Sequence, residues 1–371
     1  MPTYPLVNVA EGLWVDEFSE GGVRKRTLHG GKRDGVDLIE IDNGALQLAI
    51  IPTRGMGFWR ASYQGDRVGW DSPITDGPVH PRLVNLSGAG GIGWLDGFDE
   101  MMVRCGLESN GAPYPEGNAI VGLHGKIANI PAHTVTVVTG QTLEVHGQVD
   151  ETRIFGPQLR LSTKIATLPN SSRVSIADTF TNLSDAPATM QVLYHWNFGP
   201  PHLEAGSSLV APVSMVAPRD ATAVPRIGHY GTYGAPVPGQ PECVYFFELI
   251  GDETGKTLTM LRNASGDKAI VLRFNIRQLP CFTLWKNEGG LKSGYVTGLE
   301  PGTNYPNPKP FEQSQGRVIK LEPGGSHVAM TTLEVLNTRE SVKAVETEVS
   351  LLQAKRSPMI YPTPQPTLSA G

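Results

Sequence analysis

Short apolar runs rich in β-branched residues, separated by Gly, Pro and Asn, recur along most of the chain. Residues 36–52 form two such runs with a break at Asp42-Asn43-Gly44, which predicts a hairpin. Residues 134–149 repeat the pattern around Gly140-Gln141, and residues 317–336 predict a last hairpin around Pro323-Gly324-Gly325. Further strands are expected within residues 159–196, 242–250, 257–263, 268–276 and 281–287. Many short strands joined by turns are typical of a large sandwich or barrel.

Helical patterns are few. Residues 94–105 are expected to form one helix, entered from a glycine run. Residues 341–355 carry Val342, Val345, Val349 and Leu352 at helical intervals, with Thr338 or Ser341 as the N-cap. The proline-spaced residues 356–371 are expected to be flexible or to lie over the surface. The chain therefore divides into one β domain, residues 1–340, and a C-terminal helix with its tail, residues 341–371.

Composition narrows the class of protein. The 371 residues include 43 Gly and 30 Pro, which suits many turns, and 39% hydrophobic with 18% charged residues is typical of a globular protein. A net charge of −5 gives no basic footprint for nucleic acid. The three Cys lack the spacing of a metal site and fit a reducing compartment. With no signal peptide or long apolar run visible, we expect a cytoplasmic protein with no membrane partner.

The segment "GAGGIG", residues 88–93, matches the G-x-G-x-x-G pattern of dinucleotide-binding proteins. That mechanism also needs a buried parallel strand before the glycines and a βαβ unit around them. Here "HPRLVNLS" precedes the glycines and hairpin patterns surround them. We interpret the segment as a loop that enters a helix, and we expect no nucleotide cofactor.

Three ionisable residues lie beside apolar strand sequence and next to glycine or aromatic residues. His124 lies in "VGLHGK", His195 ends an apolar strand in "VLYHWNFG", and Glu300 lies in "YVTGLEPGTNYPNP", where a strand is expected to meet a proline-braced loop. Each histidine alone is more often a structural residue. Two imidazoles and a carboxylate together are the parts of general acid–base catalysis near neutral pH.

The order and wording of these pieces resemble the aldose 1-epimerase (galactose mutarotase-like) superfamily. The pieces are "GLHGK", "DTFTNLSDAPATMQVLYHWNFG" and "YVTGLEPGTNYPNP", and the resemblance covers roughly residues 34–336. The wording of "GWLDGFDEMMVRCGLESNGAP" is closer to a less characterised branch than to true galactose mutarotases. The resemblance implies a mainly β fold, a β-supersandwich of antiparallel sheets, with a sugar-binding cleft on one face.

The resemblance also implies roles in the interconversion of α and β anomers of a sugar. Glu300 is expected to act as the general base on the anomeric hydroxyl and His195 as the general acid on the ring oxygen. His124 is expected to hold and polarise the sugar. Opening a hemiacetal needs one proton removed and one delivered, so this reaction requires no metal, nucleotide or covalent intermediate.

Other residues are candidates for binding a small-molecule sugar. Arg54 leaves a strand into a Gly55/Gly57 turn, where a guanidinium can fork onto hydroxyls or a carboxylate. Rim positions are expected at Arg104, Glu108 and Asn110, and aromatic stacking at Trp196, Trp285 and Tyr305. A second acidic contact to the sugar is expected at Glu204 or Glu242.

Two other functions stay open at this point. One is an epimerase or isomerase acting at a carbon centre of a keto-sugar or sugar acid. A metal often aids such a reaction, and His195, His202 and Glu204 in "HWNFGPPHLE" offer ligands for one. The other is a carbohydrate-binding protein without catalysis. The amphipathic helix covers the chain's own sandwich or that of a second copy, which leaves a homo-oligomer open.

Overall fold

Strands of the two sheets differ in their pattern of buried residues. The computed structural model describes residues 1–371. Every second residue is buried along most of β14 (Gln158–Thr167) and β15 (Arg173–Asn182), so one face of each meets solvent. By contrast, β9 (Met102–Leu107) and β23 (Val296–Gly302) are buried at every position, as are the last nine residues of β16 (Ala188–Phe198). These three strands are therefore covered on both faces. The candidate site lies on their outer face, the one that does not face the other sheet.

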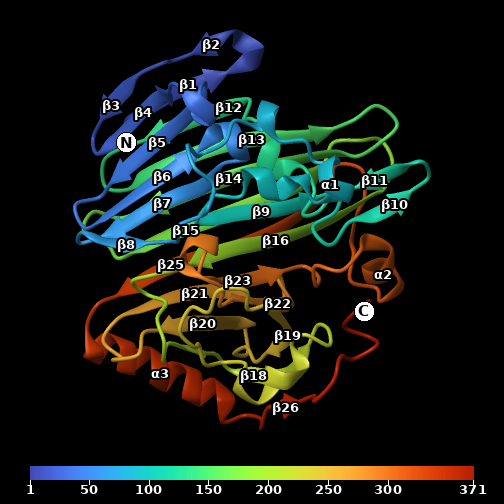
Figure 1. Ribbon diagram of the computed structural model, residues 1–371. Helices are drawn as coiled ribbons and strands as arrows, with labels where there is room; N and C mark the ends of the chain where they lie inside the picture. The colour runs from blue at the N-terminus through green and yellow to red at the C-terminus, as the bar shows by residue number, and fades with distance from the viewer.

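The two main sheets are almost entirely antiparallel. The smaller sheet has ten strands, in the order β17 (Ser208–Val210), β20 (Lys256–Arg262), β21 (Ala269–Asn275), β25 (Ser326–Leu336), β15, β14, β13 (Leu143–Thr152), β12 (Thr134–Val138), β1 (Thr3–Asn8) and β2 (Leu13–Trp14). The larger has fourteen, in the order β26 (Met359–Ile360), β18 (Val213–Pro218), β19 (Cys243–Leu249), β22 (Cys281–Asn287), β23, β16, β9, β7 (Gly57–Tyr63), β6 (Leu46–Ile51), β5 (Val36–Asp42), β4 (Val23–Leu28) and β3 (Phe18–Glu20), with β24 (Ile319–Leu321) on β16 and β8 (Asp66–Val68) on β7. In Figure 1, β9 and β16 run side by side across the middle of the molecule.

Short elements connect the strands. A separate hairpin consists of β10 (Tyr114–Glu116) and β11 (Ala119–Val121). The α-helices are α1 (Gly88–Gly91), α2 (Lys309–Ser314) and α3 (Arg339–Gln353). The 3₁₀ helices are η1 (Val9–Glu11), η2 (Gly31–Arg33), η3 (Pro52–Arg54), η4 (Pro81–Leu83), η5 (Gly93–Gly97), η6 (Ile127–Asn129), η7 (Val224–His229) and η8 (Leu291–Ser293). None of the helices combines the length and apolar character that a membrane crossing needs.

The main hydrophobic core lies between the two sheets. It takes Ile165 and Ile176 from the ten-stranded sheet and Phe58, Tyr194 and Trp196 from the larger one. The mainly β fold and the hairpins at residues 36–52 and 134–149 are confirmed, since β5 pairs with β6 and β12 with β13. Short turns make these pairings local, which is why the sequence pattern predicts them.

The C-terminal helix is confirmed as α3. Thr338 accepts a hydrogen bond from the Ser341 amide at its N-terminus, and its buried face consists of Val342, Val345 and Val349. These valines pack on apolar residues of β20 and β21, and Figure 1 shows α3 along the lower edge of the molecule. The helix therefore covers the chain's own sheet. A domain boundary near residue 340 stays a prediction.

Two expected elements are wrong. Residues 94–105 are not a helix, because the one-turn η5 ends at Gly97 and the buried strand β9 begins at Met102. Gly93 and Gly97 disfavour a helix, whereas Val103 and Arg104 point to opposite faces of a sheet. Residues 317–336 are not a hairpin either. The short β24 pairs with β16, while β25 pairs with β15 and β21.

The glycine run and the C-terminal tail are also placed. Residues 88–91 form the single turn α1, and no parallel strand precedes it, in agreement with the rejection of a dinucleotide site. The tail lies over the larger sheet, with β26 paired to β18 and Leu368 buried beside Tyr305. Figure 1 shows the chain end beside α2.

Candidate functional site

The alternation of β16 divides its side chains between the core and the outer face of the larger sheet. Tyr194 and Trp196 pack into the core between the sheets, so His195 and Asn197 point outward. On the neighbouring β23, Leu299 is in the core and Glu300 points outward beside His195. Nε2 of His195 lies 3.2 Å from Oε1 of Glu300, and the two residues are only 5% and 2% exposed. The structure thus brings together two of the three residues expected to be catalytic.

Glu300 is within a strand and not at its end. The strand β23 continues to Gly302, and Glu300 lies opposite Thr283 of β22. The expected junction of strand and loop is therefore wrong by two residues. Oε1 of Glu300 has no well-formed hydrogen bond despite the short distance to His195. A buried carboxylate oxygen without a partner is costly, and an incoming hydroxyl would satisfy it.

Burial shifts the two groups in opposite directions. Burial, with a smaller effect of the Glu242 carboxylate, raises the pKa of Glu300 well above its usual value. Burial, with the neighbouring His124, lowers the pKa of His195 well below its usual value. Each group is thus pushed toward its neutral form, while their proximity favours the charged pair. A proton can therefore be held by either member of the pair.

His124 completes the cluster from a different part of the chain. Its ring centroid lies 5.5 Å from that of His195, and its backbone has the left-handed φ of 59°. Hydrogen bonds of its N–H to Gly111 and of the Gly106 N–H to its C=O hold this conformation, which is uncommon for a residue other than glycine. Nδ1 lies 2.9 Å from the carbonyl oxygen of Asn110. Burial lowers the pKa of His124 to about 4, so the ring is neutral at pH 7.

The neutral His124 has one ring nitrogen left for a ligand. A carbonyl oxygen only accepts hydrogen bonds, so Nδ1 of His124 carries the proton and Nε2 is an acceptor. An acceptor at this place suits a sugar hydroxyl, which donates.

Aromatic side chains surround the cluster. The Trp94 ring lies 4.7 Å from the His124 ring, and the Phe98 and Trp285 rings lie 5.1 and 5.4 Å from that of His195. The Trp285 indole donates to Glu242 Oε2 at 2.7 Å, and Glu242 also accepts from Arg219 at 3.2 Å. Trp285 thus lies where stacking was expected, and Glu242 is the acidic residue beside the cluster.

Some of the residues that surround the cluster were not predicted from the sequence. Trp94 and Phe98 lay in a segment expected to be a helix. Arg219 comes from a distant loop, and no local pattern points to it. Asn197 could have been found, because residues two apart on a strand share a face.

Two arginines expected to bind substrate lie elsewhere. Arg54 is fully buried and pairs with Glu100, and its Nη1 donates to the Val79 carbonyl at 3.0 Å. Arg104 points into the core between the sheets, where it pairs with Asp178 at 2.5 Å. Strand alternation explains Arg104, because Val103 on β9 takes the outward face. Neither guanidinium reaches the cluster directly, so we do not retain these two as sugar contacts.

The other residues expected to contact a sugar bind or pack against other parts of the protein. Asn110 exchanges two side-chain hydrogen bonds with Asn304, at 3.0 and 2.8 Å, and so ties the His124 loop to the segment after β23. Glu108 pairs with Arg153 at 3.1 Å. Tyr305 is buried, stacks on Phe246 and donates to the Phe247 carbonyl at 3.0 Å. Trp196 is fully buried in the core. Of these, only Asn110 touches the cluster, through its carbonyl.

The proposed metal ligands do not converge. No group of three or more His, Cys, Asp or Glu side chains lies close enough to hold a metal ion. Glu204 accepts a hydrogen bond from the Ala264 amide at 3.1 Å. Asp66 and Lys268 are the charged groups near His202, whose pKa burial lowers to about 4. His195, His202 and Glu204 therefore do not form a ligand set in this structure.

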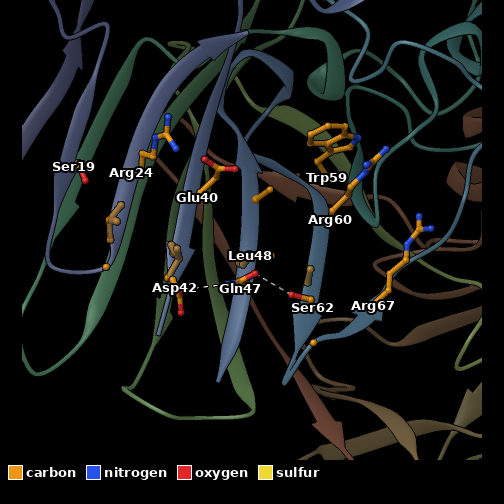
Figure 2. A pocket seen from close by; sticks show the side chains of 16 residues that line it. Ser19, Arg24, Glu40, Asp42, Gln47, Leu48, Trp59, Arg60, Ser62 and Arg67 are labelled. Carbon is orange, nitrogen blue, oxygen red and sulfur yellow. Dashed lines mark hydrogen bonds between the residues drawn. The ribbon is translucent and has the colours of Figure 1, made fainter. Parts of the chain in front are cut away.

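One large depression on the surface lies away from the cluster. It has a volume of about 720 Å³ and lies over β4 to β7, lined by polar residues such as Arg24, Glu40 and Arg60. In Figure 2 its side chains bind one another, since Gln47 donates to Asp42 at 3.0 Å and accepts from Ser62 at 3.2 Å. It contains none of the three cluster residues. Size alone therefore does not mark it as a functional site.

Comparison with known structures defines the class of protein. Two large antiparallel sheets with few helices match the galactose mutarotase-like fold. A galactose mutarotase-like protein from Clostridium acetobutylicum aligns with a TM-score of 0.58 and 15% identity, over 85% of this chain and 98% of that one. A galactose 1-epimerase from Lactobacillus acidophilus NCFM aligns with a TM-score of 0.54 and 12% identity, over 86% and 100%. At such identities the likeness shows the fold alone.

Within that class, the chain belongs to the family described as Domain of unknown function (DUF4432), whose model matches residues 33–335. A protein from Klebsiella pneumoniae subsp. pneumoniae MGH 78578, provisionally named an aldose 1-epimerase, is 36% identical with a TM-score of 0.95, over 98% of both chains. No protein with a curated description matches this chain. The expected superfamily and its less characterised branch are thereby confirmed.

Proposed function

We propose that this protein is an aldose 1-epimerase, a mutarotase that interconverts the α and β anomers of a sugar by opening and closing its ring. One observation carries the proposal: a buried histidine nitrogen and an unpartnered carboxylate oxygen lie 3.2 Å apart. The anomeric hydroxyl and the ring oxygen are bonded to the same carbon, so the groups that exchange protons with them must lie side by side.

In the proposed reaction, Glu300 takes one proton from the sugar and His195 gives one proton to it. The Glu300 carboxylate takes the proton of the anomeric hydroxyl, the bond between the anomeric carbon and the ring oxygen breaks, and Nε2–H of His195 protonates the ring oxygen. The open-chain aldehyde then rotates about the bond to the next carbon. The reverse steps close the ring on the other face. After ring opening Glu300 is protonated and His195 is neutral, which are the forms that burial favours.

The surrounding residues bind and orient the sugar in this proposal. His124 accepts a hydrogen bond from a hydroxyl through Nε2. The Trp285 face offers an apolar surface to the ring, and its indole N–H holds the Glu242 carboxylate where it can accept from further hydroxyls. The aromatic rings exclude water, which strengthens the electrostatic interactions with the transition state.

The test is anomer exchange followed by NMR on a panel of aldoses, uronic acids and ketoses. We expect the wild type to accelerate exchange of at least one sugar, and Glu300→Gln and His195→Asn each to lower kcat by about 10²–10⁴-fold. Glu334→Gln is the matched control, a buried carboxylate on β25 of the other sheet that pairs with arginines. It should leave the activity of the folded protein unchanged.

Two results would redirect the proposal. A new sugar isomer appearing over time, without faster anomer exchange, would point to an epimerase acting at a carbon centre. Sugar binding that survives in Glu300→Gln, with no exchange by the wild type, would point to a binding protein.

A further inference from the structure

We propose that Asn197 is a positioning residue that holds His195 with a proton on Nδ1 and presents Nε2 to Glu300. The inference deepens the proposed function and its kinetic consequence rests on it, but the predicted tautomer can be measured without any sugar. Asn197 is fully buried and lies two residues beyond His195 on the same face of β16.

The hydrogen bonds of Asn197 fix which way its amide points. Nδ2 lies 3.0 Å from the Glu100 carbonyl oxygen and 3.1 Å from that of His195. Both oxygens only accept, so the NH₂ group must face them and Oδ1 must face the imidazole. Oδ1 lies 2.6 Å from Nδ1 of His195. Because an amide oxygen cannot donate, Nδ1 carries the proton whatever the charge on the ring.

This arrangement decides which nitrogen exchanges protons. With Nδ1 occupied, only Nε2 can gain or lose a proton, and Nε2 is the atom that faces Glu300. When Nε2 gives up its proton, the product is the neutral Nδ1–H ring with its bond to Asn197 intact. Without Asn197 the charged ring would keep a buried N–H with no acceptor, which is costly. The bond to Asn197 raises the pKa of His195 against the lowering by burial, and so favours the ring that carries a proton on Nε2 for delivery.

The segment that binds the Asn197 amide is itself held by other buried residues. The Glu100 carbonyl that receives its amide also accepts from the Trp70 indole at 2.9 Å, and the Glu100 carboxylate pairs with the buried Arg54. Arg54, which was expected to touch a sugar, instead fixes the segment that orients Asn197. The connected residues are Arg54, Glu100, Asn197 and His195.

The first experiment is ¹⁵N NMR of histidine-labelled protein at a pH where His195 is neutral, with the His195 signals assigned by their loss in His195→Asn. We expect a protonated Nδ1 and an unprotonated Nε2 in the wild type. Asn197→Leu, similar in size but without an acceptor, should shift the proton toward Nε2. Asn182→Leu is the matched control, because Asn182 is equally buried and its amide donates to the backbone carbonyls of Ala186 and Leu321 and not to a histidine.

The NMR outcomes are decisive on their own. A wild-type His195 with a protonated Nε2 and a bare Nδ1 would overturn the proposal, even if Asn197→Leu does not fold. An Asn197→Leu protein that keeps the Nδ1 proton would also overturn it. A tautomer change in Asn197→Leu that is absent from Asn182→Leu would support it.

The second experiment follows kinetics on whichever sugar the wild type exchanges. We expect Asn197→Leu to lower kcat by about 10²-fold with KM changed little, since loss of the group that holds a histidine tautomer impairs the chemical step. Asn197→Asp restores an acceptor and should recover much of kcat. Its carboxylate should also move the acid limb of the pH profile upward, because a negative neighbour raises the pKa of His195.

The kinetic experiment gives different results if the role of Asn197 is wrong and if the proposed function is wrong. Equal losses in Asn197→Leu and Asn197→Asp, with one common pH profile, would assign Asn197 a structural role only. If the wild type exchanges no sugar, the proposed function fails, while the tautomer measurement still decides the role of Asn197.

Discussion

Gly298 lies on the outward face of β23, two residues before Glu300, and its missing side chain leaves room for the carboxylate. A Cβ atom built on Gly298 would lie 2.3 Å from Oε1 of Glu300 and 3.1 Å from the His195 ring. Gly298→Ala should therefore displace the flexible end of Glu300 while the strand itself stays paired. We expect kcat for anomer exchange to fall about 10²-fold, as when a catalytic group is misplaced by about 1 Å.

Thermal unfolding checks that the change is local. The melting temperature of Gly298→Ala should stay close to that of the wild type. Gly228→Ala, at a glycine whose Cβ would contact nothing, should change neither kcat nor stability. Full activity in Gly298→Ala would show that the carboxylate is not held where the proposed reaction needs it.

At the scale of elements, the segment after β23 is clamped by the C-terminal tail. The Asn307 side chain donates to the Leu368 carbonyl at 2.9 Å and accepts from the Ala370 amide at 3.1 Å. The Ser369 hydroxyl donates to the backbone carbonyl of Arg219, whose guanidinium holds Glu242 beside the cluster. The tail therefore supports the loop that carries the rim of the site.

Removing residues 365–371 should loosen this rim. We expect the free energy of unfolding to fall by about 2–4 kcal/mol, from the lost burial of Leu368 and its neighbours, and KM to rise more than kcat falls. Denaturant titration and anomer exchange measure the two effects. The variant Leu368→Ala keeps the hydrogen bonds and should show the stability loss with a smaller change in KM. Unchanged KM in the truncated protein would show that the tail does not support the rim.

The elements also show how far the sequence predicts the structure. Hairpins such as β5–β6 depend on turn residues a few positions apart, so the local pattern predicts them. The neighbours of β16 are β9, β23 and β24, which come from distant parts of the chain, and no local pattern gives that order. The same limit applies to the site. His195 and Glu300 were found through motif order, whereas Arg219 meets Glu242 only in the folded chain.

At the scale of the whole molecule, a buried ion pair joins the two sheets beneath the site. Arg104 of β9 donates to both carboxylate oxygens of Asp178 on β15, at 2.5 and 3.0 Å. Tyr194 of β16 donates to the same carboxylate at 2.7 Å, and Thr163 of β14 accepts from Arg104 at 2.9 Å. Strand alternation predicts that Arg104 points to one face, but only the packed sandwich places an acid opposite it.

Removing one partner of this ion pair should lower the free energy of unfolding more than replacing both partners with apolar residues. Arg104→Met leaves Asp178 as a buried charge with too few partners, so we expect the free energy of unfolding to fall by about 3–5 kcal/mol. Combining Arg104→Met with Asp178→Leu and Tyr194→Phe removes both charges and the tyrosine hydroxyl that would lose its acceptor. Only neutral acceptors of Arg104, the Thr163 hydroxyl and the Gly55 and Met56 carbonyls, lose their donor, so most of that loss should be recovered. Arg160→Met, which breaks the more exposed pair with Asp150, should cost at most about 1 kcal/mol. Guanidinium titration of the four proteins measures these differences. A triple variant no more stable than Arg104→Met would show that the pair itself, and not the uncompensated charge, holds the two sheets together.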